Sequence, residues 1–143
     1  MSFFQLRTPR DMLDKAHREH DRLAASFDID NVFNFFITAS HIRDYVRDAV
    51  SKLALYEFLK DPDISDARDL CDKGKHLRLT KRPDPSTSHT TLGPLNTAPL
   101  NTLAINARRE VWMLKSGDRT VDVAALAIRV IQKWDAFFTG NGL

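Results

Sequence analysis

Residues 32–49 are the segment that most restricts how this chain can fold. The preceding Asp28-Ile29-Asp30-Asn31 offers a helix cap. Near the start of the segment, apolar residues occupy almost every side of a helix, and such a helix has to be buried among other elements. The pattern therefore predicts the central helix of a bundle. Its apolar residues are Val32, Phe33, Phe35, Phe36, Ile37, Ala39, Ile42, Tyr45, Val46 and Ala49.

Two further helices are expected before Pro62. Thr8 can cap a helix and Pro9 suits its first turn, so the first helix should run from about Pro9 to Ser26. Residues 52–60 continue the apolar pattern after the central helix, as a separate short helix. Pro62 should end this short helix, because the residue before a proline avoids helical geometry.

Strand signals occur shortly before the last helix. Residues 103–105, 111–114 and 119–121 resemble short strands, and a turn signal separates the last two. Asp122 can then cap a final helix that ends at Gly140. The expected fold class is mainly α, an up-and-down helical bundle with a small C-terminal β-hairpin before the last helix.

The composition changes sharply between residues 80 and 102. This stretch holds four of the six prolines and eight Ser or Thr residues. The proline spacing argues against both a helix and a central strand, and a structureless loop of this length is usually functional or disordered. The chain is therefore expected to form one domain, residues 1–143, with a flexible loop at 80–102.

Charge and cysteine content exclude few functions. The net charge of +2 is too small to argue nucleic-acid binding from global charge. Cys71 is the only cysteine, so no intramolecular disulfide can form and a reducing interior is the default. No run of about 18 apolar residues is present, so no membrane span is expected. These features predict a cytoplasmic protein.

A polar ladder of Arg68, Asp72 and His76 is the first candidate for chemistry. It lies on a third main helix expected to start at Asp63 or Ser65, where four-residue steps keep the three side chains on one stripe. His76 could transfer protons, Arg68 could hold a phosphate, and Asp72 could orient the imidazole. Alternatively, Arg68 and Asp72 form an ordinary surface pair and His76 interacts with the helix C-terminus.

Polar residues also recur at helical spacing on the central helix. Such groups are costly to bury unless they are paired, so they should face something polar. The ladder would be a natural partner, and a cleft between the two helices would then place His41 opposite His76. The alternative is a buried hydrogen-bond network that sets the helix register. The stripe comprises Asn34, Thr38, His41, Tyr45 and Asp48.

A basic segment at residues 73–82 follows the ladder. Its five cations could attract a phosphate backbone such as RNA through counterion release. No aromatic residue is interleaved, so base stacking is not indicated, and a solvated surface is the alternative. Gly74, within this segment, predicts that the preceding helix frays or turns near there. The cations are Lys73, Lys75, Arg78, Lys81 and Arg82.

Metal and cofactor sites are not predicted. His17 and His20 could approach one ion, but no distant third ligand is identifiable and the helical zinc-protease motif is absent. The chain has no glycine-rich phosphate loop and no nucleophile elbow. Cys71, on the apolar side of its helix, has the character of a small core residue.

The sequence Asp69-Leu-Cys-Asp-Lys-Gly-Lys-His76 on a short helical bundle resembles the HEPN superfamily. The resemblance extends from Asp28 to about Lys81 and rests on Asp72 followed by Lys75-His76. It implies a four-helix bundle, often dimeric, and in active members a metal-independent ribonuclease whose Arg precedes the His by four to six residues. Seven residues separate Arg68 from His76, so only His76 matches the family pattern.

Two functions follow as hypotheses. The first is a non-enzymatic interaction or dimerisation module, in which exposed aromatic residues line a homodimer face. The alternative is a HEPN-like RNA-binding protein or metal-independent endoribonuclease that uses the cleft between the second and third main helices. Its binding residues would be Lys75, Lys73, Arg78, His41, Asn34 and Tyr45, with His76, Arg68 and Asp72 as catalytic residues. The aromatic residues expected at a dimer face are Phe3, Phe4, Trp112 and Phe137.

Overall fold

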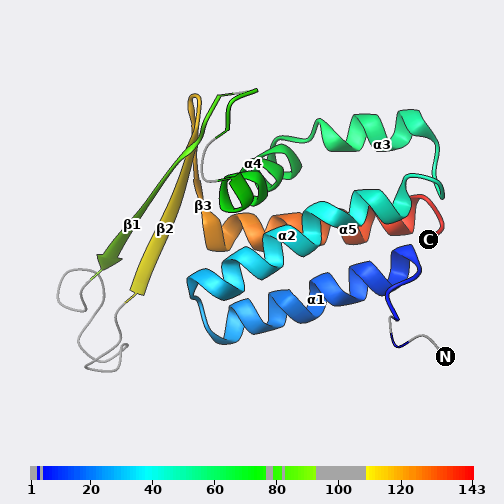
Figure 1. Ribbon diagram of the computed structural model, residues 1–143, viewed down its shortest axis with the longest axis horizontal. Coiled ribbons are helices and arrows are strands. Elements are labelled where there is room, and N and C mark those ends of the chain that lie inside the picture. Colours follow the sequence, from blue (N-terminus) through cyan, green and yellow to red (C-terminus); the bar gives the residue numbers. More distant parts are fainter. Residues whose placement is uncertain (1–2, 4, 77–78, 82, 93–108) are drawn as a thin grey trace.

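The described residues form five helices and three strands in a computed structural model that describes residues 3, 5–76, 79–81, 83–92 and 109–143. Helices α1, α2 and α5 lie side by side, whereas α4 is seen nearly end-on and runs across α2 and α5 (Figure 1). The sequence therefore predicted the mainly helical class correctly. The elements are α1 (Pro9–Ala25), α2 (Ile29–Val46), α3 (Lys52–Leu59), α4 (Pro62–His76), β1 (Ser86–Leu92), β2 (Arg109–Ser116), β3 (Arg119–Asp122) and α5 (Val123–Gly140).

Side-chain caps begin the helices where the sequence indicated. Thr8 and Asp11 form a reciprocal capping box at α1, and Asp28 accepts the Asn31 N–H at α2. Asp122 caps α5 in the same way. Asp61 accepts backbone N–H groups in the first turn of α4, so this helix begins immediately after the short α3 ends. These caps satisfy amide groups that a helix leaves without an internal partner.

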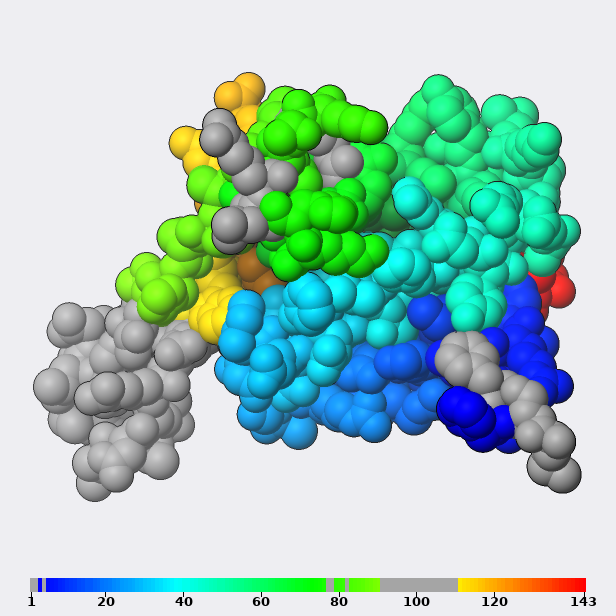
Figure 2. All heavy atoms as spheres, viewed as in Figure 1, coloured from blue at the N-terminus to red at the C-terminus, as the bar shows by residue number. Residues whose placement is uncertain are grey.

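The predicted β-hairpin is part of a three-stranded antiparallel sheet with the order β1-β2-β3. Residues 86–92, expected within a flexible loop, form strand β1, which pairs with residues 109–115 of β2. The proline signal was misread there because Pro83 and Pro85 precede the strand, which lies at the sheet edge and pairs on one side only. The predicted strand at 103–105 lies outside the described residues. In space-filling view the sheet stands beside α4 and the start of α2 (Figure 2).

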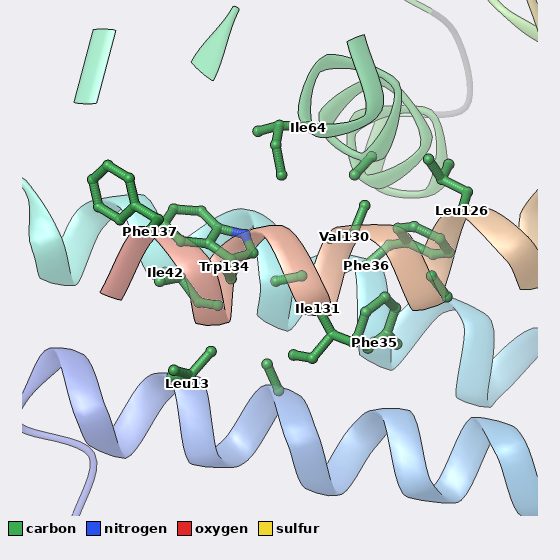
Figure 3. Close-up of a cluster of buried hydrophobic side chains, with 14 of the residues drawn as sticks. Leu13, Phe35, Phe36, Ile42, Ile64, Leu126, Val130, Ile131, Trp134 and Phe137 are labelled. Atoms are coloured by element: carbon green, nitrogen blue, oxygen red, sulfur yellow. The ribbon is translucent and has the colours of Figure 1, made fainter. Parts of the chain in front are cut away.

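The hydrophobic core lies between α1, α2, α4 and α5. Trp134 of α5 is buried and its ring contacts Phe137 and Phe58. Phe58 also contacts Phe137, so the short α3 packs against α5 through this ring. Helix α2 contributes Phe35 and Phe36, which are fully buried and contact each other edge to face. Helix α2 contacts α1, α4 and α5 as a central helix should, but Ile29 and Phe33 are exposed, so it is not buried on all sides. Figure 3 shows the core side chains meeting between the helices.

Gly74 allows α4 to pack closely against the start of α2. A Cβ atom at this position would lie 2.8 Å from the Phe33 ring, which is closer than van der Waals contact permits. Helix α4 continues past Gly74 and ends at His76, two residues later, which agrees with the prediction that it ends near this glycine. The glycine also provides space for the Phe33 ring in the last turn of the helix.

A double-mutant cycle tests this role of Gly74. In the wild-type background, the helix-propensity gain of Gly74→Ala is opposed by displacement of Phe33. In a Phe33→Ala background, we expect the same change to stabilise the fold by about 1 kcal/mol, the usual Gly-to-Ala difference in a helix. Urea unfolding of the four proteins measures the coupling. An identical effect of Gly74→Ala in both backgrounds would show that the ring does not constrain this position.

Candidate functional site

The strongest candidate site lies where α4 crosses α2, at a surface here called the α2–α4 seam. We define it by Ser40, His41 and Arg43 of α2 and by Arg68, Cys71 and Lys75 of α4. Ile64, Ala67 and Cys71 recur at helical spacing and are buried, so they define the inward face of α4. Arg68 and Lys75 lie next to this face, which places their cations along the boundary between the two helices.

A small pocket opens into the seam. Its volume is about 20 Å³, enough for one water molecule or one oxygen atom of a larger ligand. Its polar lining comes from Ser40, Arg43 and Arg68, and core residues form the rest. The complete described lining is Ala39, Ser40, Arg43, Leu59, Ile64, Ala67, Arg68, Val130 and Trp134.

Two residues that line the pocket each have a buried polar atom without a hydrogen-bond partner among the described residues. Arg68 Nε and Ser40 Oγ are both inaccessible to solvent and neither makes a hydrogen bond of acceptable geometry. A buried N–H without an acceptor costs about 1–3 kcal/mol. The Nε of Arg68 therefore favours an acceptor oxygen entering the pocket.

The two guanidinium groups beside the pocket are held only loosely by acidic neighbours. Arg43 Nε lies 3.9 Å from Asp44, and Arg68 Nη2 lies 3.8 Å from Asp69. Both distances are longer than a hydrogen bond, and the arginine side chains remain 46% and 41% exposed. Both arginines can therefore turn donors toward an anion arriving from solvent.

His41 and Lys75 join the two helices farther along the seam. His41 Nδ1 lies 2.7 Å from the Ile37 carbonyl oxygen, and Nε2 lies 3.3 Å from Lys75 Nζ. A carbonyl can only accept, so Nδ1 carries the proton and the Nε2 lone pair accepts from the ammonium group. Both imidazole nitrogens are thus committed to protein partners.

Cys71 contributes no nucleophile to the seam. The residue is 2% exposed, and burial raises the pKa of its thiol above the ordinary value. Lys75, Ser40 and Arg43 act in the opposite direction, but burial is the larger effect. The thiol therefore stays protonated at neutral pH, and the interpretation of Cys71 as a core residue is confirmed.

The predicted ladder is helical but does not form one assembled group. Arg68 lines the seam pocket, Asp72 is half-buried, and His76 is exposed at the end of α4. No hydrogen bond or ion pair joins Arg68 to His76 within the described residues. Arg78, another predicted binding residue, lies outside the described residues.

The remaining predicted binding residues are dispersed. Lys73 forms two hydrogen bonds with Asp84, at 3.0 and 2.9 Å, so this acid offsets its charge. Lys75 donates a hydrogen bond to His41 Nε2. Asn34 is exposed, whereas Tyr45 packs partly buried against the core. The expected cleft with two facing histidines is therefore replaced by a seam whose pocket is lined by two arginines.

The polar stripe on α2 also differs from the expectation for a buried helix. Thr38 is buried, but it accepts from Lys15 of α1 and not from α4. Asn34 is exposed, and Asp48 is exposed beyond the end of α2. His41 and Tyr45 are half-buried, with His41 bonded to Lys75 of α4. The expectation failed because α2 has one solvent-facing side along its length.

The predicted aromatic dimer face is wrong in part. Phe137 is 8% exposed and packs on Phe58 and Trp134, while Trp112 packs edge to face on Phe27. Phe3 is exposed, and Phe4 lies outside the described residues. The tertiary packing uses two of these aromatic rings inside the domain.

Sequence reasoning missed an ion network at the start of α4. Asp63 forms ion pairs with Arg119 at 3.3 Å, with Arg129 at 3.1 Å and with Lys133 at 2.7 Å. Arg119 also binds Asp66 at 3.0 Å, and Lys133 binds Asp61 at 2.7 Å. The network fastens α4 to α5 and to β3. The acidic residues around Pro62 and the i,i+4 pair Arg129 and Lys133 were the available signals, but their proximity depends on the crossing of α4 over α5.

The two buried carboxylates of this network have opposite pKa shifts. Burial acts to raise the pKa of Asp63, but hydrogen bonds and charge from Arg129 and Lys133 outweigh it and lower the pKa. Burial raises the pKa of Asp66, and Arg119 offsets this only in part. The ionised form of Asp63 therefore stabilises the fold at neutral pH, whereas ionising Asp66 is unfavourable.

Substitution of these two residues should give different results. Asp63→Asn leaves three cations without their shared carboxylate, and we expect it to lower the free energy of unfolding by about 2–3 kcal/mol at pH 7. Asp66→Asn loses the attraction of Arg119 but removes an unfavourable buried charge, so we expect a change within about 1 kcal/mol. Urea unfolding of both variants measures the difference.

The effect of Asp63→Asn should also depend on pH. Because the folded pKa of Asp63 is lowered, its contribution is present above its ordinary value of 3.8 and is lost as the pH falls through the folded pKa. The gap between wild type and variant should therefore shrink below pH 3.8. Equal losses for the two substitutions, or a gap that widens in acid, would contradict the assignment.

Comparisons with protein-family models, with curated proteins and with solved structures gave no match for this chain. The HEPN resemblance therefore remains a prediction that rests on Asp72, Lys75 and His76. Within the described residues, no helix has the length and apolar character needed to cross a membrane. The same part of the chain contains no group of three or more His, Cys, Asp or Glu side chains placed to hold a metal ion.

Proposed function

We propose that the chain is a non-enzymatic RNA-binding module that holds backbone phosphates at the α2–α4 seam. The buried Nε of Arg68 carries the proposal, because Arg68 lines a pocket with room for one acceptor oxygen. Arg43 provides a second guanidinium at the same pocket. A phosphate oxygen in the pocket would satisfy the buried donor, and its remaining oxygens would stay within reach of both exposed guanidinium groups.

The spacing of cations favours a chain of phosphates over a single small anion. Lys75 follows Arg68 by seven residues, which corresponds to about 10 Å along a helix with a rise of 1.5 Å per residue. A strand of linked phosphates can contact both side chains along the seam, with one phosphate at each. RNA is such a strand of linked phosphates. It is available in the cytoplasm, the compartment predicted from the lone cysteine.

We propose binding in preference to cleavage because of where the two imidazoles, His41 and His76, lie and what they bond to. Both ring nitrogens of His41 are committed to Ile37 and Lys75, and His76 is exposed at the end of α4. RNA cleavage without a metal needs a base near the 2′-hydroxyl and donors at the phosphorane. The seam supplies cationic donors but no adjacent uncommitted base among the described residues.

Arginine substitutions in the seam test this proposal. We expect the double variant Arg43→Ala/Arg68→Ala to bind a 20-nucleotide single-stranded RNA about tenfold more weakly at 50 mM salt. Each lost phosphate contact should lower the slope of log affinity against log salt by about 0.7. Fluorescence anisotropy across a salt series measures both quantities. Arg47→Ala is the matched control, because Arg47 is exposed near the end of α2 but lies outside the seam.

Three results would reject the assignment. RNA binding that is absent in wild type, or that does not depend on salt, would remove RNA as the partner. An equal loss in Arg47→Ala would show a general charge effect with no role for the pocket. Cleavage of the RNA in EDTA that disappears in His76→Ala would replace the non-enzymatic proposal with the HEPN-like nuclease.

A further inference from the structure

The sheet and the helices form a wedge that is closed at β3 and open at β1. Directly paired residues project from the same face of an antiparallel sheet, so Leu114 shares the inner face with Val121 of β3 and Thr87 of β1. Val121 and Leu114 are buried against the core, whereas Thr87 is exposed. Burial is therefore lost toward β1, on the face that points at the helices.

The wedge contains the larger of the two pockets described here. Its volume is about 340 Å³, within the range of about 300–1,000 Å³ typical of small-molecule sites. Ile29 and Val32 of α2, Leu70 of α4 and Val123 of α5 form the helical wall. Figure 2 shows the start of α5 at the bottom of the hollow between the sheet and the helices. The sheet wall consists of Thr87, Ser88, His89, Trp112 and Met113.

The helical wall and the sheet wall of the wedge differ in polarity. The helical wall is entirely apolar, and no Lys, Arg, Asp or Glu occurs among the nine described lining residues. On the face that points at the helices, hydrogen-bonding side chains come only from the sheet among the described residues, as the Thr87 hydroxyl, the His89 imidazole and the Trp112 indole N–H. The wedge thus matches a neutral ligand that places a polar group against β1 and apolar surface against the helices.

Trp112 gives the wedge a fixed aromatic wall. Its ring packs edge to face on Phe27 at a centroid distance of 5.1 Å and lies 6.5 Å from the His89 ring. The contact with Phe27 holds the indole from the helical side, so a ligand need not order this side chain on binding. A flat ring in the ligand would gain stacking or edge contacts with the indole.

We infer that the wedge binds a neutral, ring-containing apolar molecule with one hydrogen-bonding group directed at Thr87 or His89. This site is distinct from the α2–α4 seam, since the described linings of the two pockets share no residue. Ile29, 63% exposed at the mouth, indicates that the apolar surface continues from the pocket to solvent.

The neutral aromatic amine N-phenyl-1-naphthylamine serves as the probe. It has two ring systems and one N–H group, and its fluorescence rises when it leaves water. We expect saturable binding of one probe per full-length chain, with energy transfer from Trp112. Ile29→Lys adds a charge at the mouth and should weaken binding at least tenfold. Leu53→Lys is the matched control, because Leu53 is 69% exposed on α3 and should leave the affinity within twofold.

A second variant approaches the wedge from the sheet. Thr87→Trp fills the space from β1 at an exposed position and should also weaken binding at least tenfold, with circular dichroism confirming the fold of each variant. Absence of saturable binding to the wild-type chain would overturn the inference. Equal loss in Leu53→Lys, or undiminished binding to both Ile29→Lys and Thr87→Trp, would place the probe elsewhere and overturn it as well.

Discussion

Burial of the inward side of α2 among α1, α4 and α5 is the constraint on which the other features depend. Phe35, Phe36 and Ile42 are withdrawn completely from solvent, and each large side chain so buried contributes about 1.5–3 kcal/mol. With this side fixed, the opposite side of α2 must face solvent and carry its polar residues. The edge between the two sides is where α4 crosses, and the seam lies there.

Helix α4 divides its charges between two tasks. Its first half places Asp63 and Asp66 against cations of α5 and β3, which anchors the helix across the bundle. Its second half carries Lys73, Lys75 and His76, which suit the negative end of the helix dipole. The acidic half is neutralised inside the protein and Asp84 offsets Lys73, so Lys75 and Arg68 are left to interact with anions. The proposed RNA contact follows from this division.

Crossing geometry also accounts for both pockets. Where α4 lies close to α2, Gly74 admits the Phe33 ring, and the seam pocket between the helices retains only a small volume. Where the sheet covers the end of the helices, β3 and β2 are pressed onto the core and β1 stands away. The first pocket is small and cationic, and the second is larger and apolar. The two pockets therefore suit different ligands.

The sequence by itself determined the local elements of this protein. Helix caps at Thr8, Asp28 and Asp122, and the apolar spacing of α2 and α5, act over a few residues and could be read directly. The tertiary structure alone decided which side chains meet. Asp63 binds Arg129, and Arg43 and Arg68 line one pocket. Both arrangements bring together residues far apart in the chain, and they depend on how the helices cross. Local patterns contain no information on the angle at which helices cross. The sequence therefore predicted that His76 and Arg68 share a site, whereas packing leaves His76 exposed.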